Sequence, residues 1–385
     1  MKNTISVWAV FGTRPEAIKM LPLVKQLKNA PDFDITVCIT AQHREMLDQV
    51  MDVFDVKADI DLNVMTAGQT LGTLTSKVIT GLDDALNKAT RKPDYILVHG
   101  DTSTTLSAAL AGYYHQIPVG HVEAGLRTFD INSPFPEEGN RQMVGRIASL
   151  HFTPTSRATQ TLKNELVSPS AIVQTGNTVI DALMWMEQKL NVEPALAGDM
   201  IAYVDNIKTN FKKYVLVTGH RRENHGSGFK RICAALRYLA INHPDVAIVY
   251  PVHPNPKVRG PVEEELGDLP NVDLIEPQDY APFLYLMKNS HLILTDSGGV
   301  QEEAPSLAIP VLVMRDTTER QEAVDAGTVK LVGTNTDMII KEAEILLHDA
   351  DAYRAMAKTE NPYGDGHACK RIEDALRHSF ESKGI

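Results

Sequence analysis

Short apolar segments rich in β-branched residues alternate with longer segments of helical period along nearly the whole chain. The predicted strands are residues 5–11, 35–40, 95–99, 117–122 and 151–153 in the first half, and 214–218, 246–252, 272–275, 292–295, 311–314 and 329–332 in the second. Amphipathic stretches such as 44–54 and 228–241 lie between them. This alternation is typical of α/β folds, in which parallel sheets carry helices on both faces.

The alternation pauses between residues 176 and 213, where 181–190 and 198–211 have the pattern of helices. A chain of 385 residues is long enough for two domains of ordinary size. We therefore expect one α/β domain over residues 1–176 and a second over 177–366, facing each other across a cleft. Ligands of such sheets bind beyond the carboxyl ends of the strands.

The composition of the chain limits the kinds of molecule that we expect the protein to bind. Hydrophobic residues make up 43% and charged residues 23% of the chain, as in ordinary globular proteins. The net charge of −11 argues against nucleic-acid binding, which needs a basic face. The three cysteines are far apart and fit reduced thiols, and no apolar run approaches the ~18 residues of a membrane span. We expect a cytoplasmic protein that binds no nucleic acid and no membrane.

The most informative segment is HLILTDSGGVQEEAPS, residues 291–306. Its apolar run ends in Asp296-Ser297-Gly298-Gly299, and a segment compatible with a helix follows. Unpaired backbone N–H groups at such a turn, together with the helix dipole, form an anion site, and glycine allows a phosphate to approach the backbone. The alternative is a plain tight turn.

The turns after the other predicted strands are similarly polar, with candidate residues Arg14, Lys19, Asp101, Glu123, Glu137, His220, Arg221, His253 and Arg320. Cations and carboxylates gathered at one edge of each sheet predict a polyanion site with acid–base chemistry, the alternative being solvated loops with incidental charge. The chain has neither GxGxxG after its first strand nor GxxxxGK[ST], and no cluster with the spacing of zinc ligands. We therefore expect no dinucleotide cofactor and no metal.

Eight motifs together resemble those of the non-hydrolysing UDP-N-acetylglucosamine 2-epimerases: GTRPEAIKM, TAQHREMLDQV, LVHGDT, HVEAGLRT, TGHRREN, LTDSGGVQEEAPS, MRDTTER and NPYGDG. The resemblance implies the GT-B architecture of two Rossmann-like domains, with a last helix, about residues 367–385, that packs back on the first. It also implies a homodimer that equilibrates UDP-GlcNAc with UDP-ManNAc and supplies ManNAc for bacterial surface polysaccharides.

Carbon 2 of the sugar is not next to a carbonyl, so its hydrogen is not acidic. Inversion there needs either transient oxidation by NAD or loss of UDP from carbon 1 followed by its return. Without a dinucleotide fingerprint, elimination is the better interpretation, and the family is thought to use it, through 2-acetamidoglucal. Fixed cations and backbone N–H groups would stabilise the leaving diphosphate.

The resemblance also assigns roles. It implies that Asp101, Glu123 and Glu137 are the acid–base carboxylates, that Glu303 accepts ribose hydroxyls, and that Gln278 and Phe283 hold the uracil. Around UDP it places Arg14, Lys19, His220, Ser297, Gly298, Gly299, Glu303 and Arg320, with Asp101 and Glu123 also contacting substrate. Three alternatives stay open: Asp101 caps the next helix, Glu137 is a solvated loop charge, and His220 only orients a loop.

Many bacterial members bind a second, activating UDP-GlcNAc, and the matching positions here are Gln42, Glu137, Arg221 and His253. One further family position, a glutamine, is Glu45 in this chain, and a basic residue near Gly68 is missing. Two other functions remain as alternatives: a glycosyltransferase that uses a UDP-sugar, and a silent nucleotide-sugar sensor. The first would need an acceptor groove, and the second would have lost the carboxylates.

Overall fold

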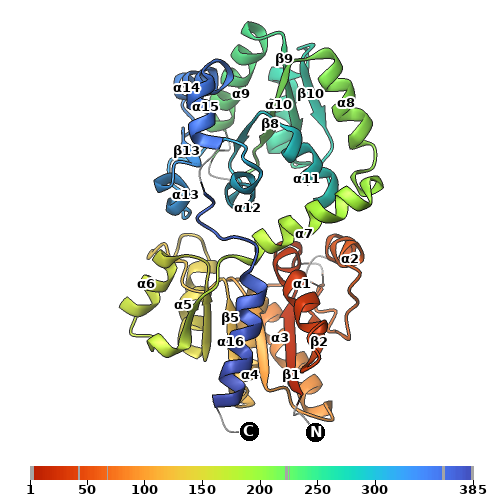
Figure 1. The fold of residues 1–385 in the computed structure, drawn as a ribbon, viewed down its shortest axis with the longest axis vertical. Coiled ribbons are helices and arrows are strands. Elements are labelled where there is room, and N and C mark those ends of the chain that lie inside the picture. Colours follow the sequence, from red (N-terminus) through yellow and green to blue (C-terminus); the bar gives the residue numbers. More distant parts are fainter. Residues whose placement is uncertain are drawn as a thin grey trace. The chain divides into compact units, whose positions relative to one another are not determined.

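The protein consists of two compact units, an N-terminal unit of Met1–Ala182 and Tyr363–Ile385 and a C-terminal unit of Leu183–Pro362 (Figure 1). The computed structural model describes residues 4–41, 44–66, 68–221, 224, 226–357 and 360–382. The predicted boundary at Gly176 immediately precedes α7 (Thr178–Val192), and this helix crosses from the first unit into the second.

The N-terminal unit has a seven-stranded sheet in the order β3-β2-β1-β4-β5-β6-β7, and every strand pair is parallel. The strands are β1 (Ile5–Phe11), β2 (Phe33–Ile39), β3 (Ile60–Asp61), β4 (Tyr95–His99), β5 (Val119–Val122), β6 (Leu150–Thr153) and β7 (Ile172–Gln174). β1 and β4 are buried along their whole length because helices cover both faces of the sheet. The α/β prediction is confirmed for this unit.

The helices of this unit are α1 (Arg14–Lys28), α2 (Arg44–Val53), α3 (Leu71–Lys88), α4 (Ser103–Tyr114), α5 (Glu137–Ile147), α6 (Ser156–Asn164) and α16 (Ala368–Ser382). α16 comes from the far end of the chain and packs against α1 (Figure 1). Its first turn is capped by Asp181, which accepts hydrogen bonds from the backbone of Ala368 at 3.1 Å and of Cys369 at 2.9 Å. The C-terminal segment thus belongs to the first unit.

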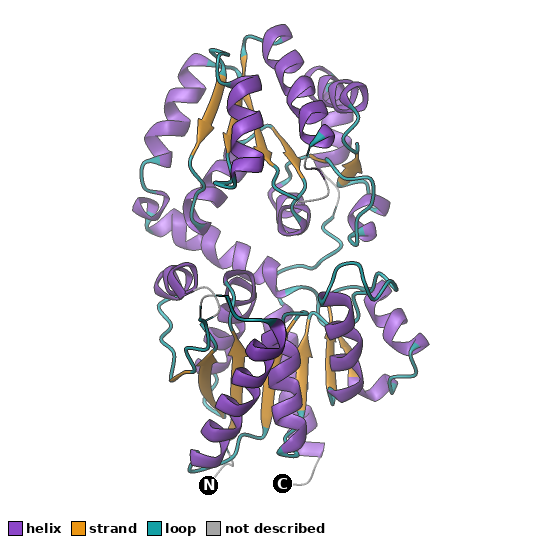
Figure 2. Ribbon diagram, turned by 180° about the vertical axis from the view of Figure 1, so that it is seen from behind, coloured by secondary structure: helices purple, strands orange, loops and turns teal. Residues whose placement is uncertain are grey.

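The C-terminal unit has a six-stranded parallel sheet in the order β10-β9-β8-β11-β12-β13. Figure 2 shows strands of both units in orange and the helices in purple. Its strands are β8 (Lys213–Thr218), β9 (Val246–Pro251), β10 (Val272–Ile275), β11 (Leu292–Thr295), β12 (Val311–Val313) and β13 (Val329–Leu331). Its helices after α7 are α8 (Met200–Asn210), α9 (Ser227–Asn242), α10 (Pro256–Leu266), α11 (Tyr280–Asn289), α12 (Gly298–Glu303), α13 (Gln321–Asp325), α14 (Thr336–His348) and α15 (Ala350–Ala357).

Each unit has its own apolar core. In the N-terminal unit, buried residues such as Val10, Val78 and Ile96 join the sheet to α3 and α4. In the C-terminal unit, Ile248 and Leu292 pack with α9, α10 and α14. Among the residues that the structure describes, no helix combines the length and apolarity needed to span a bilayer.

The sequence pattern missed two strands, β3 and β7, which are both edges of the first sheet. They contain two and three residues, and their side chains are only partly buried or exposed. A strand that short has no readable alternation, and only its pairing with a neighbour defines it. Each predicted strand overlaps one of the other observed strands.

Candidate active site

In the N-terminal unit, Glu16 joins the turns after β1 and β4. Its Oε2 accepts hydrogen bonds from the backbone N–H of Gly12 at 3.1 Å and of Thr13 at 2.8 Å. Its Oε1 accepts from the hydroxyls of Thr102 at 2.7 Å and Thr105 at 3.2 Å. With Thr13, Glu16 forms the capping box of α1. The loops that carry Arg14 and Asp101 are therefore fixed to one buried carboxylate.

Lys19 and Glu123 form a buried ion pair, although 104 residues separate them in the chain. Glu123 adopts a left-handed backbone conformation with φ of 62°, in the turn that follows β5. Asn177 donates a hydrogen bond to the same carboxylate at 2.8 Å, and His99 Nε2 lies 3.7 Å away. Burial opposes ionisation, but the Lys19 ammonium and then His99 hold the pKa of Glu123 well below its usual value. Glu123 is therefore an ionised carboxylate.

Asp101 is bound by a guanidinium. Arg141 of α5 donates to its Oδ2 from Nε at 2.9 Å, and contacts Glu138 through Nη1 at 3.1 Å. The residue that caps α4 is Thr102, whose side chain accepts from the backbone of Thr105, so the capping alternative for Asp101 is wrong. Glu137 is the first residue of α5 and is half-buried. Glu137 thus stands at a helix start rather than within the loop, with its side chain still partly exposed.

In the C-terminal unit, buried Asp296 organises the turn after β8. Its Oδ2 accepts hydrogen bonds from the backbone N–H of His220 at 2.9 Å and of Arg221 at 2.8 Å, and from Asn224 Nδ2 at 3.2 Å. The ring of His220 is half-exposed and stacks on the ring of His253, with 5.4 Å between centroids. Desolvation, His253 and Arg221 lower the pKa of His220 against the opposing pull of Asp296. The imidazole is therefore biased toward its neutral form.

The turn after β11 places Ser297, Gly298 and Gly299 at the start of α12. A β-carbon at Gly298 would lie 2.7 Å from Arg320 Nη1, so only glycine allows the guanidinium to approach this turn so closely. Arg320 is held there by Glu302, at 2.9 Å, and by Glu319. Burial tends to raise the pKa of the Glu319 carboxyl, but the nearby arginines Arg320, Arg315 and Arg221 lower it to about 2. A fixed, paired cation thus lies beside backbone N–H groups.

Three further predicted residues lie in this unit. The carboxylate of Glu303, buried on α12, accepts a hydrogen bond from Tyr280 at 2.8 Å. The amide of Gln278 donates to the backbone oxygen of Glu276 at 2.8 Å, and Phe283 is half-buried on α11. Gln42, predicted for the second site, lies outside the residues that the structure describes.

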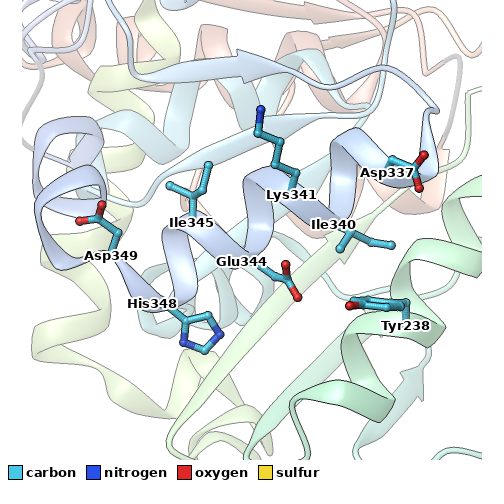
Figure 3. Close-up of a pocket in the computed structure, with 8 residues that line it drawn as sticks. All are labelled: Tyr238, Asp337, Ile340, Lys341, Glu344, Ile345, His348 and Asp349. Atoms are coloured by element: carbon cyan, nitrogen blue, oxygen red, sulfur yellow. The ribbon is translucent and has the colours of Figure 1, made fainter.

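A shallow hollow of the C-terminal unit, lined by α14 and by Tyr238 of α9, has a volume of about 650 Å³ (Figure 3). Its lining includes Tyr238, Ile340, Lys341, Glu344 and His348, and none of the predicted site residues. The chemistry of a site is set by its polar groups rather than by cavity size, so we place the candidate site at the strand ends.

Sequence reasoning missed Asn177, Arg141 and Tyr280 in these two clusters, and it gave no role to Glu16, Asp296 and Glu302, although they lie in the polar turns that it singled out. Glu16 had a readable signal, because Thr13 and Glu16 have the spacing of a capping box. Asn177, Arg141 and Tyr280 had none, since each acts on a partner at least 23 residues away.

Two α/β units, each with a parallel sheet and a polar cluster beyond its strand ends, define a protein of the GT-B fold class. The family model described as UDP-N-acetylglucosamine 2-epimerase matches residues 25–377. The chain is 56% identical over 374 residues to the UDP-N-acetylglucosamine 2-epimerase of Yersinia pestis, which covers 97% of this chain and 99% of that one. The chain therefore belongs to the UDP-N-acetylglucosamine 2-epimerase family, as the resemblance of its motifs indicated.

Solved structures of UDP-GlcNAc 2-epimerases match the fold of this chain over nearly its whole length. The UDP-GlcNAc 2-epimerase from Neisseria meningitidis, bound to UDP-GlcNAc, superposes with a TM-score of 0.90 at 50% identity, covering 97% of this chain and all of that one. The S. aureus MnaA structure with UDP gives a TM-score of 0.86 at 46% identity, with coverage of 98% and 97%.

Proposed function

We propose that the protein interconverts UDP-GlcNAc and UDP-ManNAc by eliminating UDP and adding it back. A carboxylate removes the hydrogen of carbon 2 while the bond between carbon 1 and the diphosphate oxygen breaks, which gives 2-acetamidoglucal and UDP. Return of UDP to carbon 1 and of a proton to the opposite face of carbon 2 gives the epimer. Electrons and atoms balance without an oxidant, so the reaction needs no NAD.

The observation that carries this proposal is the buried, ionised Glu123 beside Lys19, in a chain whose relatives are UDP-N-acetylglucosamine 2-epimerases. An ionised carboxylate can accept the carbon-2 hydrogen, and Asp101 and Glu137 are the other candidates for the two faces. His220, Ser297, Gly299, Arg320 and Arg14 are proposed to bind the diphosphate, where they would stabilise charge developing on the leaving group.

Contacts within the C-terminal unit support the nucleotide assignments. Tyr280 orients the Glu303 carboxylate, which we assign to the ribose hydroxyls. Phe283 offers a half-buried ring for the uracil, and Gln278 an amide for its edge. His253 and Arg221 adjoin His220, which supports a second UDP-GlcNAc site that would also use Gln42 and Glu137.

Incubation with UDP-GlcNAc in deuterated water, without acceptor or NAD, tests the proposal. We expect deuterium at carbon 2 of both epimers, because the hydrogen exchanges with solvent on the carboxylate. Retention of protium in the product would exclude elimination. Transfer of the sugar only when an acceptor is added would favour the glycosyltransferase alternative.

The homodimer, the cytoplasmic location and the supply of ManNAc for surface polysaccharides are parts of the same proposal. Tyr113 and Tyr114 are exposed at the end of α4, which is consistent with a contact between copies. Light scattering of the purified chain would measure its mass in solution, and a monomer at micromolar concentration would contradict the dimer.

A further inference from the structure

We propose that Asn177 is a positioning residue that fixes the Glu123 carboxylate and links it to both chain segments connecting the two units. The inference rests on the function proposed above, in which Glu123 exchanges the carbon-2 hydrogen. Asn177 is 2% exposed and follows β7, directly before α7.

Asn177 contacts the Glu123 carboxylate directly. Asn177 Nδ2 donates to Oε2 at 2.8 Å, and Lys19 pairs with the same oxygen. His99 Nε2 lies 3.7 Å from that oxygen, but the last torsion of a glutamate side chain is broad, and Lys19 reaches the carboxylate from the end of a long side chain. A second donor on a short, buried side chain restricts that rotation. Asn177 therefore adds a short, fixed contact that limits how Glu123 presents its second oxygen.

The backbone and the side-chain oxygen of Asn177 make further contacts. Its N–H donates to the carbonyl oxygen of Tyr363 at 2.7 Å, and its Oδ1 accepts from the N–H of Val179 at 3.1 Å. Val179 lies in the first turn of α7, which leads into the C-terminal unit, and Tyr363 is the first residue after the chain returns. One residue thus contacts the outgoing segment, the returning segment and the carboxylate.

The outgoing and returning segments pack closely against each other. A β-carbon at Gly176 would lie 3.3 Å from the carbonyl oxygen of Tyr363 and 3.4 Å from the Cα of Gly364. Both glycines have positive φ, of 88° and 136°. Backbone lies against backbone with no side chain between, so a displacement of either segment reaches Asn177 directly. The start of α7 also lies beside the start of α16 (Figure 1), where Asp181 caps that helix.

The competing explanation is that Asn177 only caps α7. The two roles differ in the pH dependence of turnover. The charged and titratable groups that face Glu123 are Lys19 of α1 and His99 of β4, and the Asn177 amide is the neutral donor among them. Loss of a hydrogen bond to the ionised form raises the pKa of a carboxylate. The acid limb of kcat/KM then moves to higher pH, whereas loss of a helix cap alone leaves it in place.

Asn177→Asp is the sharpest variant. It is nearly isosteric, retains an acceptor for Val179 and the N–H for Tyr363, and replaces the donor to Glu123 with an anion. A hydrogen bond to a charged group is worth a factor of about 10 to 100 in an equilibrium constant. We expect kcat to fall by about that factor and the acid limb to move up by about one pH unit. The Kd for UDP, measured by calorimetry, should change less than about threefold.

Asn271→Ala is the matched control. Asn271 is also a buried asparagine, and its Nδ2 donates to the backbone oxygens of Ala240 and Val246 at 3.0 and 2.8 Å. It belongs to the C-terminal unit, whereas Glu123 belongs to the N-terminal unit. We expect this variant to lower the denaturation midpoint and to keep the acid limb of the parent. Asn177→Ala, which removes the donor without adding charge, should show a smaller shift of the limb in the same direction as Asn177→Asp.

The inference is overturned if both Asn177 variants keep the parental acid limb and differ only in denaturation midpoint, as Asn271→Ala does. If Asn177→Asp does not fold, Asn177→Ala decides the question by the same measurement. Glu123→Gln separates this outcome from failure of the proposed function. If Glu123→Gln still exchanges deuterium into carbon 2, Glu123 does not have its proposed role. If Glu123→Gln loses this exchange while Asn177→Asp keeps the parental kcat and acid limb, only the role of Asn177 is excluded.

Discussion

Arg141 holds the Asp101 carboxylate from 40 residues away, with Nε at 2.9 Å and Nη2 at 2.7 Å from the same oxygen, Oδ2. Its third contact is Glu138, whose side chain is fully buried. Desolvation opposes the charge of Arg141, but Asp101 and Glu138 raise its pKa above the usual value. One guanidinium therefore stabilises a candidate catalytic carboxylate and a structural one.

Arg141→Ala should destabilise the N-terminal unit by about 3 kcal/mol, because it leaves Glu138 buried without its cation. Turnover should fall as well, since Asp101 loses both of its donors. The chain has two tryptophans, and Trp8 lies in the N-terminal unit while Trp185 lies in the other. In a Trp185→Phe background, the fluorescence of Trp8 during urea denaturation therefore reports on the N-terminal unit alone.

The control for this variant is Arg91→Ala. Arg91 pairs with Asp94 at 2.7 Å in the same unit, but half of its side chain is exposed. Exposed pairs contribute about 1 kcal/mol or less. If the two variants lost equal amounts of unfolding free energy, the importance assigned to Arg141 would be contradicted.

The buried histidines of β5 and β6 predict how stability changes with pH. Desolvation is the main cause that lowers the pKa of His121 to about 3 and of His151 to about 4. Below their ordinary value near 6.5, the unfolded chain binds protons that the folded chain does not. The stability of the N-terminal unit is therefore complete above pH 6.5 and falls as the pH drops toward 4, by up to about 1.4 kcal/mol per pH unit for each histidine.

His151→Gln removes one of these titrations. The urea midpoint of this variant, followed by Trp8 fluorescence at pH 7, 6 and 5, should decline less steeply than that of the parent. Parallel slopes for the two proteins would show that His151 does not titrate on unfolding in this range.

Gly298→Ala tests the approach of Arg320 to the turn before α12. The added methyl would press on the guanidinium, so Arg320 should shift away from the buried Glu302 and from Glu319, and some stability should be lost as well. Because charge-assisted contacts to phosphate are strong, we expect the Kd for UDP to rise about tenfold. Titration calorimetry with UDP would measure it.

Gly299→Ala is the comparison at the other glycine of this turn, which is also proposed to bind the diphosphate. A β-carbon there has Glu303 Oε2 at 3.7 Å as its nearest atom, which is an ordinary contact. Its effect on UDP affinity should be clearly smaller than that of Gly298→Ala. The reverse order would show that backbone access, rather than the position of Arg320, limits binding.

Glu16→Gln should disturb the link between the turns after β1 and β4. The carboxylate accepts four hydrogen bonds, from Gly12, Thr13, Thr102 and Thr105, and an amide offers only one accepting oxygen in its place. With buried donors left unsatisfied, we expect a loss of about 2 kcal/mol and a lower kcat. Thr70→Ala, which removes an exposed cap of α3, should lower stability by less and leave kcat unchanged.

The sequence by itself determined the features that depend only on residues near one another in the chain, namely the strands, the helices and the polar turns after the strands. The alternation of apolar and amphipathic segments fixes strands and helices locally, because each must bury one face, and it led to the α/β fold. Since chemistry at parallel sheets gathers at strand ends, the turns that carry Lys19, Asp101, Glu123 and His220 could also be found by reading along the chain. Motifs of this length were sufficient to indicate the family.

Only the tertiary structure decided which of these groups meet. The order β1-β4-β5 brings Lys19 to Glu123, and Asn177 reaches the same carboxylate from 54 residues away. Glu123 is ionised because a cation lies beside it in space, and Asp101 is held because α5 packs next to α4. Electrostatic energies depend on distance and burial, and neither is a property of any single segment of the chain.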